Sequence, residues 1–441
     1  MKSFSMTPRL LALSIGVALA FPLQAQNLVE LYEAARPYDA GYKSARSQFD
    51  ANVAKADQAL AGILPSAGLS MGISRTNIDA NIPLPNTAFG AQSATVVGSQ
   101  PLYRPANRIT YEQGRKSIEV AQAQLILAEQ DLIVRVSQAY FDVLAAQDNL
   151  TFVNAQKVAV AEQLASAKRN FEVGTSTITD TREAQARYDL VIATEIAADN
   201  DLRVKKIALD QLVGRTNVVP KPLAAPVTLP PLLPADVNLW VLQSEQGHPS
   251  IRQAELGLEV ARMETQKAKA ANLPTVDLNG SYGITRNEGS STATASYRTN
   301  VASVGVALSM PLFAGYAIQN RIKETLSLEE KAGSDLDAAK RAVAQGTRTA
   351  YFGVLSGQGQ VKALEAAEVS TQSALDANKL GYQVGVRINI DVLNSQSQLF
   401  QTKRDLAKAR YDVLVGGLRL RQANGSLQSG DLQAVNALLA K

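Results

Sequence analysis

Apolar and small residues recur along two long stretches of this chain with the spacing of helices that pack together. Between 118 and 153, eleven such positions follow one another at a mean interval of 3.5 residues, and the stretch from 336 to 364 repeats the pattern. An interval of 3.5 residues is the coiled-coil period, whereas a free helix has about 3.6. Because no proline occurs from 106 to 219, the pattern predicts one helix from 106 to about 172. A helix of that length, roughly 100 Å at about 1.5 Å per residue, must pack on other long helices.

Shorter stretches alternate apolar with small or polar residues, which is typical of β-strands with one apolar face. The clearest are 275–284 and 301–312; 69–74 alternates as well, and its partner at about 94–102 is the least clear. Two interpretations stay open, because a half-buried sheet of a soluble protein alternates in the same way as a strand of an outer-membrane barrel.

The four strands are expected to pair as two β-hairpins, over 65–103 and 274–313, with polar loops at 78–93 and 285–300. Four strands cannot close a barrel, since the smallest membrane barrels use about eight. If these strands lie in a membrane, more than one chain must contribute, and the chain is an obligate oligomer. Its loops would then face outside and its long helices would point into the periplasm.

Two decapeptides predict sharp reversals between long helices. FEVGTSTITD at 171–180 and YQVGVRINID at 382–391 share a glycine and an aspartate at the same places. Glycine adopts left-handed backbone angles without steric cost, so it allows a helix to end and the chain to reverse. We expect turns near 174 and 385, the first followed by a helix with Asp180 or Thr181 as its N-cap.

These decapeptides belong to a tandem repeat. AYFDVLAAQ at 139–147 returns as AYFGVLSGQ at 350–358, and the motifs around the hairpins also return 209 to 211 residues later. Since order and offset are both kept, the chain is predicted to hold two structural repeats, at 26–219 and 236–425. Each is expected to consist of a first helix, a β-hairpin and long helices joined by the glycine turn.

The first helices of the repeats are predicted as single helices of about 35 residues, at 27–61 and 236–271. Between the repeats, 220–235 contains PKPLAAPVTLPPLLP, with six prolines in fifteen residues. Proline resists helix formation, so we interpret this stretch as an extended connector. A C-terminal segment, 426–441, follows the second repeat.

Residues 1–25 have the pattern of a secretory signal peptide. Lys2 and Arg9 precede a 12-residue apolar run at 10–21, and Ala25 supplies the small residue of a cleavage site. A membrane anchor would need about 20 apolar residues. No later stretch offers 18, so no transmembrane helix is expected.

The composition excludes several functions. The formal charge is +4 and the basic residues are scattered, which speaks against nucleic-acid binding. The absence of cysteine excludes disulfides, thiolate metal sites and a lipid-modified cysteine. His248, the only histidine, stands at a helix start without a neighbouring ligand and is interpreted as structural. No GxxxxGK motif or catalytic constellation occurs, so we expect no enzyme, cofactor or metal.

Taken together, these motifs resemble the TolC family of outer-membrane channel-tunnels. The shared features are the duplication, LP before each hairpin, PL[YF] after it, AYF–VL in each long helix and the two VG turns. The resemblance implies a mainly α protein with a membrane β-barrel. Three tandem-repeat protomers would form a 12-stranded β-barrel continuous with a long coiled-coil α-helical barrel.

The same resemblance implies a function. The protein would be a passive exit duct in the cell outer membrane, with its helices in the periplasm, for a tripartite efflux or type I secretion system. Cargo would be small toxic compounds, secreted proteins or both. Its partners would be two further copies in a homotrimer, a periplasmic adaptor (membrane fusion protein), an ABC or proton-driven inner-membrane pump, and outer-membrane lipid, but no nucleic acid.

One alternative of a different class stays open, a periplasmic coiled-coil adaptor or scaffold without a pore. Such a protein would normally show one helical hairpin between soluble β-domains, whereas this chain has two alternating hairpins in tandem.

Residue roles at the two turns also follow from the resemblance. Asp391 would form a three-carboxylate ring at the narrowest part of the periplasmic entrance, and Asn394 replaces a second aspartate of the family. The residues expected to link the entrance shut are Thr179, Asp180, Tyr382 and Arg387. The residues expected to contact adaptor hairpins are Val173, Gly174, Thr175, Val384, Gly385 and Val386.

Overall fold

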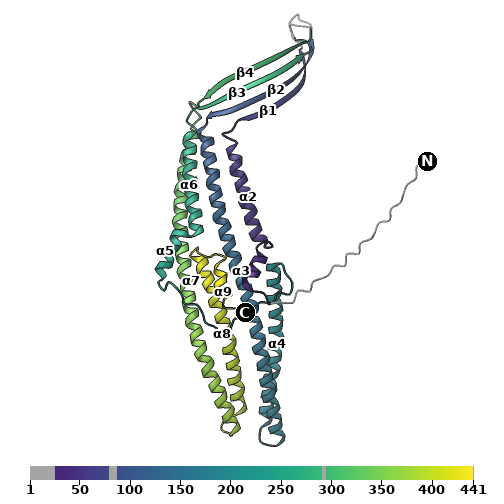
Figure 1. Ribbon diagram of the computed structural model, residues 1–441, viewed down its shortest axis with the longest axis vertical. Coiled ribbons are helices and arrows are strands. Elements are labelled where there is room, and N and C mark those ends of the chain that lie inside the picture. The colour runs from purple at the N-terminus through teal and green to yellow at the C-terminus, as the bar shows by residue number, and fades with distance from the viewer. Residues whose placement is uncertain (1–24, 79–86, 291–294, 441) are drawn as a thin grey trace, which may run out of the picture.

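The computed structural model describes residues 25–78, 87–290 and 295–440, so the predicted signal peptide, except for Ala25, lies outside it. The molecule is long and thin, with a curved sheet at one end and pairs of helices reaching the other end (Figure 1). This shape follows from the length of the helices rather than from a central globular core.

The structure contains helices and strands in the order that the two repeats predict. The helices are α1 (Leu28–Ala35), α2 (Ala40–Leu60), α3 (Pro105–Glu172), α4 (Ile178–Val213), α5 (Val237–Gly247), α6 (Pro249–Ala270), α7 (Ala317–Gln383), α8 (Asn389–Ala423) and α9 (Asp431–Asn436). The strands are β1 (Ser66–Ile78), β2 (Thr87–Tyr103), β3 (Thr275–Asn287) and β4 (Tyr297–Ser309).

The two longest helices confirm the prediction from the apolar spacing. α3 has 68 residues and α7 has 67, and they pair with α4 and α8 as antiparallel hairpins. Where α3 meets α4, buried residues recur every seven positions, the coiled-coil repeat. These residues are Val153, Val160 and Ala167 in α3 and Ala184, Val191 and Ala198 in α4. None of the helices in the described ranges has an apolar run long enough to cross a membrane.

The prediction of single first helices at 27–61 and 236–271 is wrong, because each is two helices. α1 ends at Ala35 and α2 starts at Ala40, whereas α5 and α6 meet at His248. A side chain caps the second helix in both cases. Asp39 Oδ1 accepts a hydrogen bond from the Tyr42 amide (2.7 Å), and His248 Nδ1 accepts one from the Ser250 amide (3.1 Å). Such caps stabilise a new helix start within an otherwise helical stretch, and His248 has the structural role expected of it.

The sheet has the order β1-β2-β3-β4, and all neighbours are antiparallel. The pairing of β2 with β3 joins the two repeats. The strands are longer than predicted, since β2 begins at Thr87 rather than near 94. Polar residues do not end these strands, because backbone pairing satisfies the peptide groups whatever the side chain. The predicted loops 78–93 and 285–300 are therefore largely strand, and 79–86 and 291–294 lie outside the described residues.

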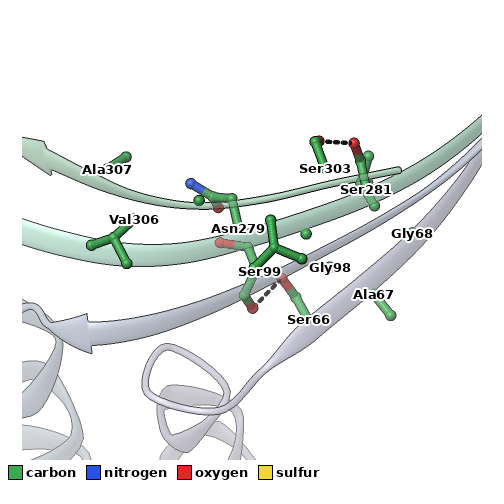
Figure 2. A pocket seen from close by; sticks show the side chains of 14 residues that line it. Ser66, Ala67, Gly68, Gly98, Ser99, Asn279, Ser281, Ser303, Val306 and Ala307 are labelled. Atoms are coloured by element: carbon green, nitrogen blue, oxygen red, sulfur yellow. Dashed lines mark hydrogen bonds between the residues drawn. The ribbon is translucent and has the colours of Figure 1, made fainter. Parts of the chain in front are cut away.

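Small side chains from all four strands line a shallow hollow of about 750 Å³ on the curved sheet (Figure 2). Across this hollow Ser281 Oγ and Ser303 Oγ lie 2.8 Å apart. Large apolar side chains of β1, in contrast, are exposed and have no cover within the chain: Leu69, Met71 and Ile73. An exposed apolar surface of this kind marks contact with lipid or another protein.

The main core lies halfway along the molecule, where α1, α3, α4, α8 and α9 meet. Phe141 of α3 stacks on Tyr411 of α8 with ring centroids 5.6 Å apart. The Tyr411 hydroxyl donates to Asp148 Oδ2 at 2.6 Å. Burial raises the pKa of Asp148, and the hydrogen bond from Tyr411 partly opposes that shift. The carboxylate therefore depends on this one donor.

Tyr411→Phe is expected to destabilise the protein by about 1–3 kcal/mol at neutral pH, because it leaves the Asp148 carboxylate buried without its donor. The cost should shrink as the pH falls and Asp148 becomes protonated, since its pKa in the folded state is already raised. Thermal unfolding in detergent, followed by circular dichroism, measures the effect. In an Asp148→Asn background the same substitution should cost less than half as much; an equal loss in both backgrounds would contradict the assignment.

Candidate functional site at the helix–helix turns

The end of the molecule farthest from the sheet is formed by two helix–helix turns, one between α3 and α4 and one between α7 and α8 (Figure 1). Each contains a glycine with φ +79°, Gly174 and Gly385. Each helix end is closed alike: the Thr175 amide donates to the Asn170 carbonyl (2.8 Å) and the Val386 amide to the Gly381 carbonyl (2.9 Å). Space is open around both glycines, so it is the left-handed backbone that requires them.

The residues beside these glycines are exposed apolar side chains. Val173, Val384 and Val386 are exposed and sit at the ends of the hairpins, away from any core cluster. A protein gains nothing in its own stability from valines in such places, whereas a partner surface that covered them would gain apolar burial. Thr175 completes the set of exposed turn residues, all of which the sequence singled out.

Asp180 does not act as the N-cap of α4, as the sequence predicted; Thr177 does. Asp180 Oδ2 accepts hydrogen bonds from Ser176 Oγ (2.6 Å), the Thr177 amide (3.0 Å) and Thr177 Oγ1 (2.8 Å). Its own amide donates back to Thr177 Oγ1, which completes a capping box. Partial burial opposes ionisation, but the bonds from Ser176 and Thr177 outweigh it and lower the pKa of Asp180.

Asp391 stands at the equivalent place in the second repeat, yet its surroundings differ. The N-cap of α8 is Ile388, which has no hydroxyl, and no side chain caps this helix. Asp391 Oδ2 instead lies 3.7 Å from Arg387 Nη1. A long ion pair between side chains that are 59% and 34% exposed holds the carboxylate only weakly. Asp391 therefore stays available to other charges, whereas Asp180 is committed to its turn.

Polar contacts join the two hairpins near their ends. Tyr382 Oη accepts from Asn170 Nδ2 (3.2 Å), and Asn394 Oδ1 accepts from Arg187 Nη2 (2.8 Å). Asn389 is fully buried, bonded to Gln163 and donating to the Asp180 carbonyl at 3.3 Å. Sequence reasoning missed Asn170, Arg187, Asn389 and Gln163. The one signal was that Asn389 replaces Ile178 in the otherwise apolar spacing of the repeats.

The four residues predicted to hold the entrance shut do not pair with one another in one chain. Asp180 bonds to its own turn, Tyr382 to Asn170 and Arg387 to Asp391. Thr179 is exposed. Their predicted links remain a matter of neighbouring chains. Within the described residues, no group of three or more metal-ligating side chains occurs.

Comparison with known proteins matches both repeats to one family. Residues 32–215 and 240–426 each match the outer membrane efflux protein family. Outer membrane protein TolC of Vibrio cholerae serotype O1 is 33% identical over 438 residues, which cover 97% of this chain and 98% of that protein. Alkaline protease secretion protein AprF of Pseudomonas aeruginosa is 31% identical over 351 residues, 79% of this chain and 73% of that protein.

A solved structure gives the same picture of the fold. The outer membrane protein VceC from Vibrio cholerae superposes with a TM-score of 0.77, over 91% of this chain and 96% of that chain. Its sequence is only 18% identical to this chain, so the likeness concerns the fold alone.

Asp180→Asn should weaken the first turn of α4 by about 1 kcal/mol, because the neutral amide no longer accepts all three bonds or favours the helix N-terminus. Since ionisation lowers the folded pKa, this contribution is fully present above the ordinary carboxyl pKa and is lost as the pH falls through the lowered value. Hydrogen exchange of the amides at 178–181 measures it. Asp391→Asn is the matched control, and equal deprotection of both helix starts would refute the difference between the repeats.

Proposed function

The chain belongs to the outer membrane efflux protein family, and we propose that its two turns form the periplasmic entrance of a channel built from three copies. It is a non-enzymatic outer-membrane channel of TolC type that serves efflux or secretion. This membership excludes the alternative of an adaptor without a pore. What the channel carries, how it closes and what docks on it are the proposal.

The assembly is supported by the open sheet. β1 and β4 each have one unpaired edge, and unpaired edges cannot face lipid. Three chains supply twelve strands, enough for a closed barrel with an aqueous interior. The helix pairs then extend the barrel as an α-helical tunnel into the periplasm. Because related proteins are named for efflux and for protease secretion, we propose small toxic compounds, secreted proteins or both as cargo.

The exposed valines support the proposed docking of an adaptor. Val173, Val384 and Val386, with Gly174, Gly385 and Thr175, form small apolar ends on each hairpin. Two glycine turns per chain would give six such ends in a trimer. A periplasmic adaptor whose helical hairpins cover them would transmit the work of an inner-membrane pump driven by ATP or the proton gradient. The channel itself then needs no energy source.

Closure of the entrance is proposed to depend on links between neighbouring chains through Thr179, Asp180, Tyr382 and Arg387. Each of these side chains lies within a few residues of a turn, and Arg387 and Tyr382 make only exposed or part-buried contacts within the chain. Hydrogen bonds to charged groups contribute about 1.5–3 kcal/mol each when they are partly dry. Such links are strong enough to favour a closed state and weak enough to yield to a docked adaptor.

Tyr382→Phe combined with Arg387→Gln should raise the mean conductance in planar bilayers, and should raise the open population about tenfold for each 1.4 kcal/mol of closure lost. Lys379→Gln is the matched control, since Lys379 is exposed and has no ion pair among the described residues. Unchanged conductance in the double variant, with the control also unchanged, would refute these links.

The charge of the constriction is proposed to come from Asp391 alone. Three Asp391 carboxylates would form one ring, whereas Asn394 adds no charge and already accepts a hydrogen bond from Arg187. A single ring of three carboxylates attracts multivalent cations less than two rings would, because the field follows the number of charges. Arg187 would weaken a second ring further.

Block of the conductance by a trivalent cation is expected to strengthen in the order Asp391→Asn, native, Asn394→Asp, and Asn394→Asp with Arg187→Gln. Asp391→Asn should weaken the apparent block constant about tenfold. The combination with Arg187→Gln tests whether the guanidinium neutralises the new carboxylate. Equal block in the native channel and in both Asn394→Asp variants would contradict the proposal.

The observation that carries the proposed function is the joining, in one chain, of an open sheet with exposed apolar side chains and two glycine turns at the far end of long helices. The direct test is purified native protein in a planar bilayer. Discrete ion currents are expected, and a water-soluble protein without current would refute it. A deletion strain assayed for drug sensitivity and for secreted proteins separates the two kinds of cargo.

A further inference from the structure

The two repeats correspond helix by helix, and the correspondence extends to single buried residues. Counterparts lie 209 residues apart in the first helices and 211 apart in the long ones, where both glycine turns and both N-caps align. The buried residues of α1 are Leu28, Leu31, Tyr32 and Ala35. Their counterparts in α5 are Val237 at the helix start and the buried Trp240, Val241 and Ser244.

Each level of the molecule has two open edges. Toward the sheet the helices lie side by side in the order α2, α3, α6, α7, and toward the turns in the order α4, α3, α8, α7. The sheet has β1 at one edge and β4 at the other. One side of the chain therefore presents α2, α4 and β1, and the opposite side presents α7 and β4.

The junction between the repeats inside the chain supplies a template for joining these edges. α3 packs against α6 and α8 of the other repeat, and β2 pairs with β3. The counterparts of these pairs are α7 with α2 and α4, and β4 with β1. We propose that one chain meets the next through this second set, using the positions that already join the two repeats. This inference rests on the proposed homotrimer and assigns its subunit surfaces.

Apolar side chains carry the first part of the argument. In the internal junction Phe141 and Leu144 of α3 share one core with Val415 and Leu418 of α8, and none is more than 3% exposed. Their counterparts at the open edges are still large and apolar but uncovered: Phe352 54%, Leu355 48%, Val204 53% and Ile207 56% exposed. Burying such side chains is favourable, and the partner subunit is the surface that fits them.

Charge complementarity carries the second part. Inside the chain Arg252 of α6 binds Glu119 of α3 at 2.8 Å. The counterparts are Lys43 in α2 and Glu330 in α7, again opposite in charge. Both are exposed, and neither has an ion pair among the described residues.

A second contact changes both residues and keeps the match. Gln113 Nε2 of α3 donates to Glu264 of α6 at 3.0 Å. The counterparts are Glu324 in α7 and Lys55 in α2. Glu324 contacts only Arg321 of its own helix, and Lys55 has no ion pair in the described part of the chain. The third contact, Lys116 with Glu259 at 3.0 Å, becomes Ser327 with Asp50 and carries no charge pair.

The assigned subunit surface therefore pairs Glu324 with Lys55 of the partner subunit, and Glu330 with Lys43 of the partner subunit. The apolar contacts would hold the subunits together, and the charged pairs would fix their register, because like charges at these places repel.

Charge reversal tests the pairs. Lys55→Glu and Glu324→Lys are each expected to lower the temperature at which the trimer dissociates in detergent by at least about 2 °C. The double variant K55E/E324K should recover most of the loss. K55E/E330K reverses the same number of charges at unmatched positions and should not recover it. Equal behaviour of the two double variants would overturn the assignment.

Cross-linking tests proximity directly, because the native chain contains no cysteine. Lys55→Cys with Glu324→Cys should give covalent trimers under oxidising conditions, and Lys55→Cys with Glu330→Cys should give few. Equal yields would refute the register. If the native protein forms no trimer, the proposed assembly fails; if it forms a conducting trimer without matched rescue or cross-linking, only the surface assigned here fails.

Discussion

The constraint on which the structure depends is that a sheet of four strands leaves two rows of backbone N–H and C=O groups unpaired. In lipid an unpaired peptide group costs several kcal/mol, so the edges of β1 and β4 must find other strands. Every longer element continues the same problem. α2 and α4 follow the edge of β1, and α7 follows the edge of β4, so the whole length of the chain is left with two open sides.

Duplication solves this problem with little new chemistry. The junction between the repeats already joins a strand edge, two helix faces and a set of buried side chains within one chain. A ring needs that junction again between chains, which is why large apolar residues such as Phe352 and Ile207 stand uncovered. The repeats then diverge where the ring must work rather than close. Asp180 is fixed by hydroxyls, whereas Asp391, with Ile388 and Arg387 in place of those hydroxyls, keeps its charge accessible.

The parts of the fold that follow from local spacing could be predicted from the sequence. The coiled-coil period gave α3 and α7, and glycine gave both turns, because these signals act within a few residues. The breaks at Asp39 and His248 were missed because a side-chain cap competes with a helical pattern that continues across it. The site was harder. Asp180 was expected to be the N-cap, but Thr177 three residues earlier offered a reciprocal pair of bonds. Contacts such as Asn170 with Tyr382 join residues 212 positions apart, and no local pattern encodes them.

Stability and movement are separated along the molecule. The middle is held by a continuous core that includes Phe141 and Tyr411, together with the C-terminal helix α9. Toward the turns the apolar contacts become narrow and small, with alanines at several coiled-coil positions, and the links between hairpins are single hydrogen bonds. Small residues let helices slide with little loss of buried area, whereas a stacked aromatic pair resists it. A partner that covers the exposed valines at the ends therefore acts on the least constrained part of each hairpin. The core halfway along the molecule keeps that displacement from reaching the sheet, where strand pairing has to stay intact.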